Sequence, residues 1–370
     1  MSNLNSNYCY TFPAIRGVQA KKEYYVTMFP LKLVTKLFFN DLQELPPEYR
    51  AQRVINKTRV PEITKYIIDN PSDYVFSSLT ASIDGPYEFH PFNDDIQFND
   101  LGKLVISMDC KFLINDGQHR RSAIEEAIQQ RPELGSETIS IVFFRDEGLK
   151  RSQQMFSDLN KHAVNTTKSI GILFDHRDPI RNLTLGLIDK IELLRDFTDK
   201  ESNSISKFSP KIFLLSNIYE ANKLILSDFN KSEIEKDDQE FIIKYWALLC
   251  SNIKEWQYVK NKQLSAYELR NNYIHSHGIV LEAFGAIGNL LINQKQLLTQ
   301  NLINRLNEIN WSRQNLNDWK DRAIGPNGRI TKNRYCVILT ANIIKKQLGL
   351  ELTAEELGIE AKFEQNKRRK

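Results

Sequence analysis

The chain has 370 residues, of which 41% are hydrophobic and 26% charged, a balance typical of a globular protein large enough for two domains. The net charge of +4 permits nucleic-acid binding without requiring it. Four widely spaced cysteines form no CxxC pair, which argues against a cysteine-rich zinc site and fits reduced thiols. Because the start lacks a signal-peptide pattern and no apolar run could span a bilayer, we expect a cytoplasmic protein without membrane contacts.

The first half of the chain alternates strand and helix patterns. Extended segments are predicted at residues 8–15 and 23–29, followed by a short helix at 31–39 and a longer helical segment opened by Pro46-Pro47. A helix beginning at Pro61 ends near Asn70-Pro71. The remaining elements are strands at 74–83, 103–108 and 111–114, a helix after residue 117, a strand at 138–144 and a helix at 148–159. This order predicts an α+β domain over residues 8–200.

The second half is almost wholly helical in pattern. A polar stretch without periodicity, residues 199–204, marks the predicted domain boundary, which we place between residues 199 and 210. Helix-spaced apolar residues then recur at 211–226, 238–253, 266–272, 274–292, 297–309 and 335–348. The sequence therefore predicts a mostly α-helical domain over residues 205–370, with a basic loop at 320–334 and a basic tail at 367–370.

The segment Asn115 to Arg121 lies where a predicted strand ends and a predicted helix begins. Gly117 permits a tight turn, and Asp116 can act as the N-cap of the helix. The first-turn N–H groups, together with Arg120 and Arg121, form a candidate site for a phosphate of a nucleotide or of DNA. The alternative is a well-capped turn whose polar groups are only solvated.

Two further features bear on this candidate site. His119 is a general acid or base, a phosphate ligand, or a solvated residue of the first helical turn; a zinc role is disfavoured because no second His or Cys lies at metal spacing. Arg50, Arg53 and Lys57 share one helical face by their spacing, with Arg59 nearby, and can either contact phosphate or form an ordinary charged surface.

A second basic cluster falls within a short window late in the chain, where the acids are Asp318 and Asp321. Its cations are candidates for DNA phosphate contacts, and the alternative is again a solvated surface. No helix-turn-helix pattern is identifiable there, so base readout has no assigned element. The cluster comprises Arg313, Lys320, Arg322, Arg329, Lys332 and Arg334.

The run from Asp116 to Arg120, DGQHR in one-letter code, matches the signature of the DGQHR-domain proteins, and the chain resembles the DndB family of DNA sulfur modification proteins. The resemblance covers nearly the full length. It is carried by residues 12–19, 50–53 with 59–61, 70–71 with 74–76, 155–160, 175–179, 311–313 and 328–330.

The order of elements also resembles the ParB/sulfiredoxin-like fold, in which a loop-to-helix corner holds nucleotide phosphates opposite an Asn-bearing helix. The resemblance implies a catalytic set of Asp116, Gln118, His119, Arg120 and Asn160. The candidate phosphate contacts come from the residues themselves: Asn115, Gly117 and Arg121 at the strand-to-helix turn, and Arg50, Arg53 and Arg59 from the earlier basic cluster.

The family resemblance implies a DNA-binding repressor of a DNA phosphorothioation system, with the promoter DNA of that system as partner. ATP or another nucleoside triphosphate with Mg²⁺ at the DGQHR loop would gate the DNA affinity. The alternative is a nucleoside triphosphate hydrolase of the associated defence system. A homo-oligomer is compatible with either function, and no dedicated metal site is expected.

Overall fold

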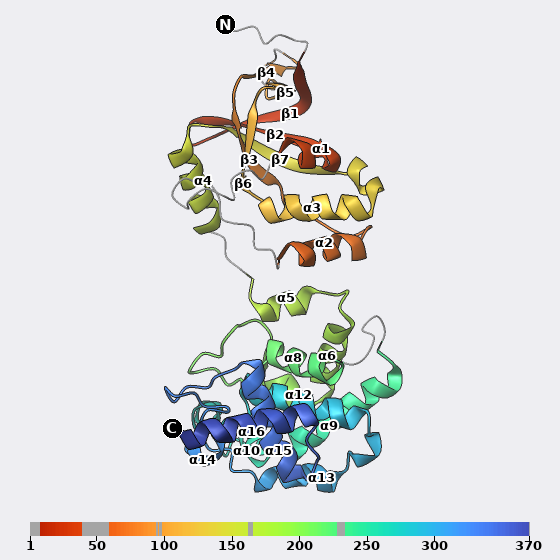
Figure 1. The fold of residues 1–370 in the computed structure, drawn as a ribbon, viewed down its shortest axis with the longest axis vertical. Coiled ribbons are helices and arrows are strands. Elements are labelled where there is room, and N and C mark those ends of the chain that lie inside the picture. The colour runs from red at the N-terminus through yellow and green to blue at the C-terminus, as the bar shows by residue number, and fades with distance from the viewer. Residues whose placement is uncertain are drawn as a thin grey trace. The chain divides into compact units, whose positions relative to one another are not determined.

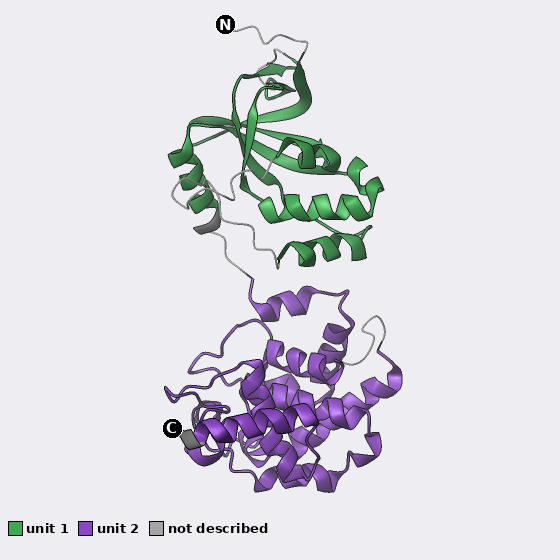
Figure 2. Ribbon diagram, in the orientation of Figure 1, with its two compact units in different colours: residues 1–164 green, residues 165–370 purple. Residues whose placement is uncertain are grey.

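The computed structural model describes residues 8–38, 59–93, 95, 98–161, 166–227 and 234–369. They form two compact units, Met1–Val164 and Asn165–Lys370 (Figure 2). The predicted helical segment after Pro46-Pro47 lies outside the described residues, and so do Arg50, Arg53 and Lys57.

The first unit is built on a seven-stranded mixed sheet with the order β4-β5-β1-β2-β7-β3-β6 (Figure 1). Strands β1 (Cys9–Gln19) and β2 (Lys22–Pro30) form a hairpin whose two turn residues, Ala20 and Lys21, have positive φ. Such a two-residue turn matches the twist of the strands that it joins. The other strands are β3 (Leu79–Asp84), β4 (Tyr87–Pro91), β5 (Leu101–Ser107), β6 (Lys111–Asp116) and β7 (Thr138–Arg145).

One face of this sheet is covered by helices. Ile139, Ile141 and Phe143 of β7 alternate as buried residues, as expected for a strand with one face in the core. They join one apolar cluster with residues of α1 (Leu31–Leu37), α2 (Arg59–Asp69) and α3 (Gln118–Gln130). A 3₁₀ turn (Pro132–Ser136) follows α3, and α4 (Leu149–Lys161) contacts β6.

Strand β3 begins at Leu79, five residues later than predicted. Side chains rather than a neighbouring strand satisfy the backbone before it: the Val75 N–H donates to the hydroxyl of Tyr66, and the carbonyls of Ser77 and Ser78 accept from Arg120. Tyr74 and Phe76 therefore pack against the core without a sheet ladder, whereas Val75 is exposed.

The second unit is helical around α12 (Gly278–Ile292), which packs against α8 (Leu215–Ile225) and α15 (Arg334–Leu348). Trp246 and Trp256 are fully buried in its core. A short parallel pair, β8 (Thr198–Asp199) and β9 (Phe213–Leu214), was not predicted. The other elements are α5 (Lys168–Phe174), α6 (Pro179–Lys190), α7 (Glu192–Phe197), α9 (Lys236–Asn252), α10 (Lys254–Lys260), α11 (Ala266–Asn272), α13 (Gln300–Asn304), α14 (Leu316–Trp319), α16 (Ala354–Arg369) and 3₁₀ turns at Lys295–Leu297 and Arg305–Glu308.

The division between the units falls at residues 164/165 rather than between 199 and 210. Helices α5, α6 and α7 belong to the helical unit because Ile172, Ile180, Leu187 and Leu194 are part of its apolar core. The polar stretch that suggested a linker is a surface loop of this unit. The fold class, an α+β unit followed by a mostly helical one, is confirmed.

Candidate functional site

The DGQHR segment forms the corner between edge strand β6 and helix α3. Gly117 is the N-cap of α3, with φ 104° and ψ 16°, in the left-handed region that favours glycine. A Cβ at this position would lie 2.3 Å from Cδ2 of buried Leu79. The predicted strand–turn–helix is therefore confirmed, together with the need for glycine.

Asp116 does not cap the helix, which corrects the prediction. The N-cap position is occupied by Gly117, which has no side chain to form a capping hydrogen bond. Instead, Asp116 Oδ2 at the end of β6 accepts a hydrogen bond of 2.6 Å from Nη2 of Arg120, four residues later in the first turn of α3. The single carboxylate of the motif is thus held in an ion pair.

Arg120 is anchored on both branches of its guanidinium. Nη1 donates to the carbonyl oxygens of Ser77 and Ser78, at 2.5 and 3.0 Å, and to the Ser77 hydroxyl. With Nη2 on Asp116, the side chain is only 15% exposed. Arg120 therefore fastens the segment before β3 to the corner, and its geometry is that of a structural clamp.

Arg121 is also a structural residue, which corrects its assignment as a phosphate ligand. Its side chain is 5% exposed; Nη1 donates to Glu125 at 2.5 Å, and Nη2 to the carbonyl oxygen of Thr35 at 2.8 Å. Thr35 lies in the last turn of α1, where carbonyls lack helical partners. Arg121 thus ties the end of α1 to α3.

Asn115 and Gln118 are buried, with 0% and 7% of their surface exposed. The Asn115 amide donates to the hydroxyl of Ser82 on β3, at 2.7 Å. Burial removes Asn115 from the surface on which a nucleotide would lie, in contrast to the prediction.

His119 is half-buried in the first turn of α3. Burial lowers its pKa, the positive charge of Arg59 at the start of α2 lowers it further, and the charge of Asp116 opposes both. The ring is therefore neutral at pH 7. The corner brings together His119, Arg59 and the N-terminus of α3. The backbone of Asn160 lies in the last turn of α4, and the position of its side chain is outside the described part of the structure.

The predicted basic loop is an ordered turn. The Thr331 N–H donates to the carbonyl of Ala323, and the Gly325 N–H to that of Arg329, which closes a tip over Pro326 to Gly328. Trp319 is fully buried at the base of this segment. We call residues 319–334 the basic hairpin.

Arg322 points into the helical unit and not to its surface, which corrects its assignment to DNA. Its guanidinium donates to both carboxylate oxygens of Glu360, at 3.0 and 2.5 Å, and lies 4.1 Å from the ring centroid of Phe363. Arg322 holds the basic hairpin against α16.

The remaining cations of the cluster are at or near the surface. Lys320 and Arg329 are exposed and form no ion pair within the described part of the chain. Lys332 pairs with Glu282 at 2.7 Å, and Arg334 is 87% exposed beside Glu355. Arg313 donates to the main-chain oxygens of Asn271 and Gly328 at 3.4 and 3.5 Å.

Sequence reasoning missed the partners that fix these arginines. Ser77 and Ser78 hold Arg120, Thr35 holds Arg121, and Glu360 holds Arg322. These partners are 38 to 86 residues away from the arginines in sequence, and no local sequence pattern predicts the contacts.

Across the described ranges, no group of three or more His, Cys, Asp and Glu residues is placed to hold a metal ion. Likewise, no helix among those residues combines the length and apolar character needed to cross a membrane.

The protein-family model for DndB, described as DNA-sulfur modification-associated, matches residues 12–351. No curated protein and no solved structure matched the chain.

Proposed function

Since the chain belongs to the DndB family of DNA-sulfur modification-associated proteins, we propose that it is a DNA-binding regulator of a DNA sulfur modification system. In this role it contacts duplex DNA in the promoter region of the system and represses its transcription. The ParB/sulfiredoxin-like assignment of the first unit is part of the same proposal, because the order of elements is its only support.

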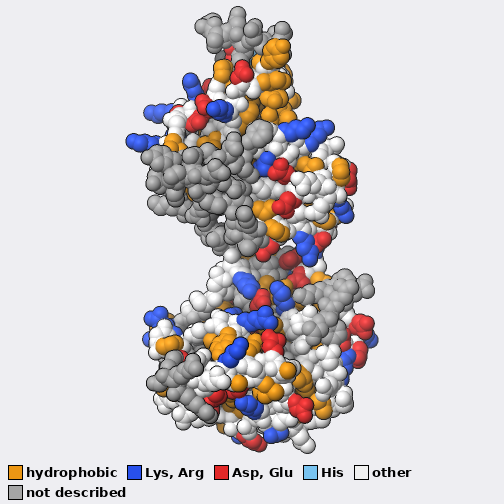
Figure 3. Space-filling view, in the orientation of Figure 1, with side chains coloured by type: hydrophobic (Ala, Val, Ile, Leu, Met, Phe, Trp, Pro, Cys, Tyr) orange, Lys and Arg blue, Asp and Glu red, His pale blue; other side chains and the backbone are white. Residues whose placement is uncertain are grey.

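The observation that carries DNA binding is the basic hairpin. Lys320, Arg329 and Arg334 are exposed on it, while buried Trp319 and Arg322 hold its base. The held backbone keeps these cations close to one another, and each contact with a DNA phosphate releases condensed counterions. The face of the helical unit in Figure 3 mixes both signs of charge, so a local cluster rather than a broad positive field supports the contact.

The DGQHR corner is the proposed second phosphate site. Helix α3 opens with a left-handed glycine, has no acid in its first turn, and has Arg59 nearby. These features favour an anion at its N-terminus, either a DNA phosphate or a nucleoside triphosphate with Mg²⁺ that gates DNA affinity.

The hydrolase alternative has weaker support. Asp116, the carboxylate nearest the corner, is held by Arg120, and a metal or a water nucleophile would have to compete for it. If the corner hydrolysed nucleotide, Asp116→Asn would abolish phosphate release. We expect no such release above background from the unaltered protein.

A salt titration of DNA affinity tests the regulator. The variant Lys320→Gln/Arg329→Gln/Arg334→Gln is compared with Lys223→Gln/Lys244→Gln/Lys254→Gln, which removes the same charge from exposed positions elsewhere in the helical unit. The slope of log affinity against log salt should shrink by about 0.9 for each DNA phosphate that a removed cation neutralises in the unaltered protein. Equal slopes for the two variants would rule out the basic hairpin as the DNA surface.

Repression is measured separately, with a reporter gene behind the promoter of the modification genes. The hairpin variant should raise reporter expression, whereas the control variant should not. Light scattering on both variants establishes whether each keeps the oligomeric state of the unaltered protein.

A further inference from the structure

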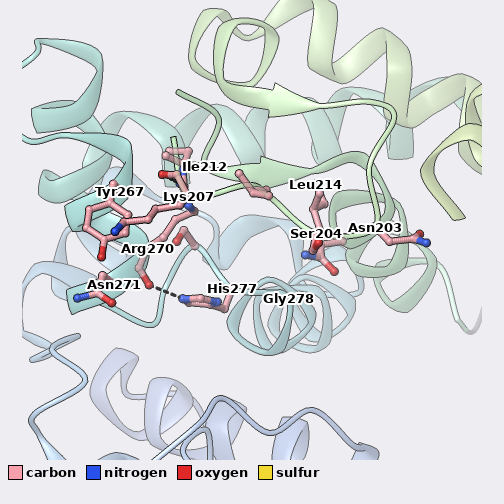
Figure 4. A pocket seen from close by; sticks show the side chains of 13 residues that line it. Asn203, Ser204, Lys207, Ile212, Leu214, Tyr267, Arg270, Asn271, His277 and Gly278 are labelled. Atoms are coloured by element: carbon pink, nitrogen blue, oxygen red, sulfur yellow. Dashed lines mark hydrogen bonds between the residues drawn. The ribbon is translucent and has the colours of Figure 1, made fainter. Parts of the chain in front are cut away.

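A cavity of about 490 Å³ lies within the helical unit, away from the basic hairpin and the DGQHR corner in sequence (Figure 4). Its walls come from five segments: the loop after β8, strand β9, the start of α8, helix α11, and the residues that lead into α12. This volume is within the range of roughly 300–1,000 Å³ that is typical of small-molecule sites.

The lining carries positive charge without a carboxylate. Lys207 and Arg270 line the cavity, no Asp or Glu does, and neither cation forms an ion pair within the described ranges. Arg270 instead donates to four carbonyl oxygens of the loop, those of Ser206, Lys207, Ser209 and Lys211. Hydrogen bonds to carbonyls position this charge without neutralising it, so the cavity favours an anion.

The N-terminus of α12 opens at the same cavity. His277 is the N-cap, Gly278 is the first helical residue, and the first turn contains no acid. A Cβ on Gly278 would lie 2.5 Å from Oδ1 of Asn217, so glycine lets this amide lie against the helix. Ser276 is 4% exposed, and its hydroxyl has no hydrogen-bond partner within the described part of the chain.

His277 has a fixed tautomer. Its Nε2 lies 2.8 Å from the carbonyl oxygen of Arg270, which can only accept, so Nε2 carries the proton. Burial lowers the pKa of the ring; the bond to Arg270 opposes this, and the charge of Arg313 adds to the lowering. His277 is neutral, and the positive groups around it belong to arginine and lysine.

An aromatic wall completes the cavity. Tyr267 lines it, with Nζ of Lys207 5.3 Å from the ring centroid. An aromatic ring can stack on any of the nucleobases, and a neighbouring cation strengthens the stacking. We propose that this cavity binds a nucleotide, with its phosphate toward the N-terminus of α12 and Ser276, and its base against Tyr267. This binding does not depend on the DNA-binding role of the basic hairpin.

The test is calorimetric titration of the full-length protein, in a buffer free of phosphate and sulfate, with AMP, GMP, CMP, UMP and inorganic phosphate as probes. At least one nucleotide should bind, about tenfold or more tightly than inorganic phosphate. Tyr267→Ala should weaken the nucleotide roughly fivefold or more and leave phosphate unchanged. Lys207→Gln should weaken both ligands.

The matched controls are Tyr258→Ala and Lys244→Gln. Tyr258 is 44% exposed and Tyr267 42%, both on helices of the same unit, but Tyr258 does not line the cavity. Both controls should bind as the unaltered protein does. Three results would overturn the proposal: no nucleotide binds, nucleotide binds no better than inorganic phosphate, or the cavity variants and their controls behave alike.

Discussion

Arg322 and Glu360 form a two-branched ion pair inside the helical unit, with contacts of 3.0 and 2.5 Å, although they are 38 residues apart. Glu360 also accepts from Asn342 at 3.0 Å. We expect Arg322→Ala to lower the free energy of unfolding by roughly 1–3 kcal/mol, because the buried carboxylate loses two charged hydrogen bonds but keeps those from Asn342 and Lys346. Urea denaturation measures this. The control is Arg329→Ala, whose exposed side chain should change stability by less than about 0.5 kcal/mol; equal costs would contradict the buried pair.

The same pair makes stability depend on pH. Burial alone would raise the pKa of Glu360, but the hydrogen bonds from Arg322 and Asn342 and the charge of Arg322 outweigh it and lower the pKa to about 2. Since the folded pKa is below the unfolded one, the contribution is full above about pH 5 and is lost as pH falls toward 2. Stability measured between pH 6 and 3 should fall less steeply in Glu360→Gln than in the unaltered protein.

The charge of Arg59 acts on the protonation of His119. Burial and the charge of Arg59 lower the pKa of His119. Arg59→Gln should therefore raise this pKa, which an NMR titration of the imidazole protons measures directly. Lys65→Gln, an exposed cation on the same helix, should leave it unchanged. A shift of equal size in both variants would mean that the effect is one of net charge.

Substitutions at Gly117 and Gly148 distinguish the cost of backbone strain from the cost of a steric clash. Both have positive φ, 104° and 92°, but a Cβ at Gly117 meets Leu79 whereas one at Gly148 meets nothing within 4 Å. We expect Gly148→Ala to cost about 1 kcal/mol and Gly117→Ala at least 2, with Gly117→Val worse again. Thermal denaturation of the three variants provides the comparison. Equal losses of stability in the two alanine variants would show that the Leu79 side chain moves away from the added Cβ without measurable cost.

Arg120 should behave as a clamp. Arg120→Ala removes the contacts to Ser77, Ser78 and Asp116, so we expect a loss of about 1–3 kcal/mol in the free energy of unfolding. Ser77→Ala removes only the hydroxyl acceptor and keeps the carbonyl oxygens of residues 77 and 78, so it should lower the free energy of unfolding clearly less than Arg120→Ala does. An Arg120→Ala variant as stable as the unaltered protein would instead return Arg120 to the ligand-binding role.

The corner could be predicted because its signals are local. A strand pattern, a glycine and a helical pattern occur within a few residues, and the structure places β6, Gly117 and α3 in that order. The roles of the arginines could not be predicted, because charge alone does not distinguish a surface cation from one that is bound to distant carbonyls. The domain boundary failed for a related reason: the polar loop after β8 is held within the helical unit by Arg270, whose partners lie 59 to 64 residues away.

The bonds of Arg313 to the oxygens of Asn271 and Gly328 join the rim of the cavity to the tip of the basic hairpin. If binding at either place shifts this side chain, the two binding events are thermodynamically linked, and the linkage must be reciprocal. If an occupant of the cavity changes DNA affinity by some factor, DNA changes the affinity for that occupant by the same factor. Protein bound to promoter DNA would then have a different affinity for the cavity ligand than protein free of DNA. The ligand concentration to which the protein responds would therefore depend on the fraction of protein bound to DNA.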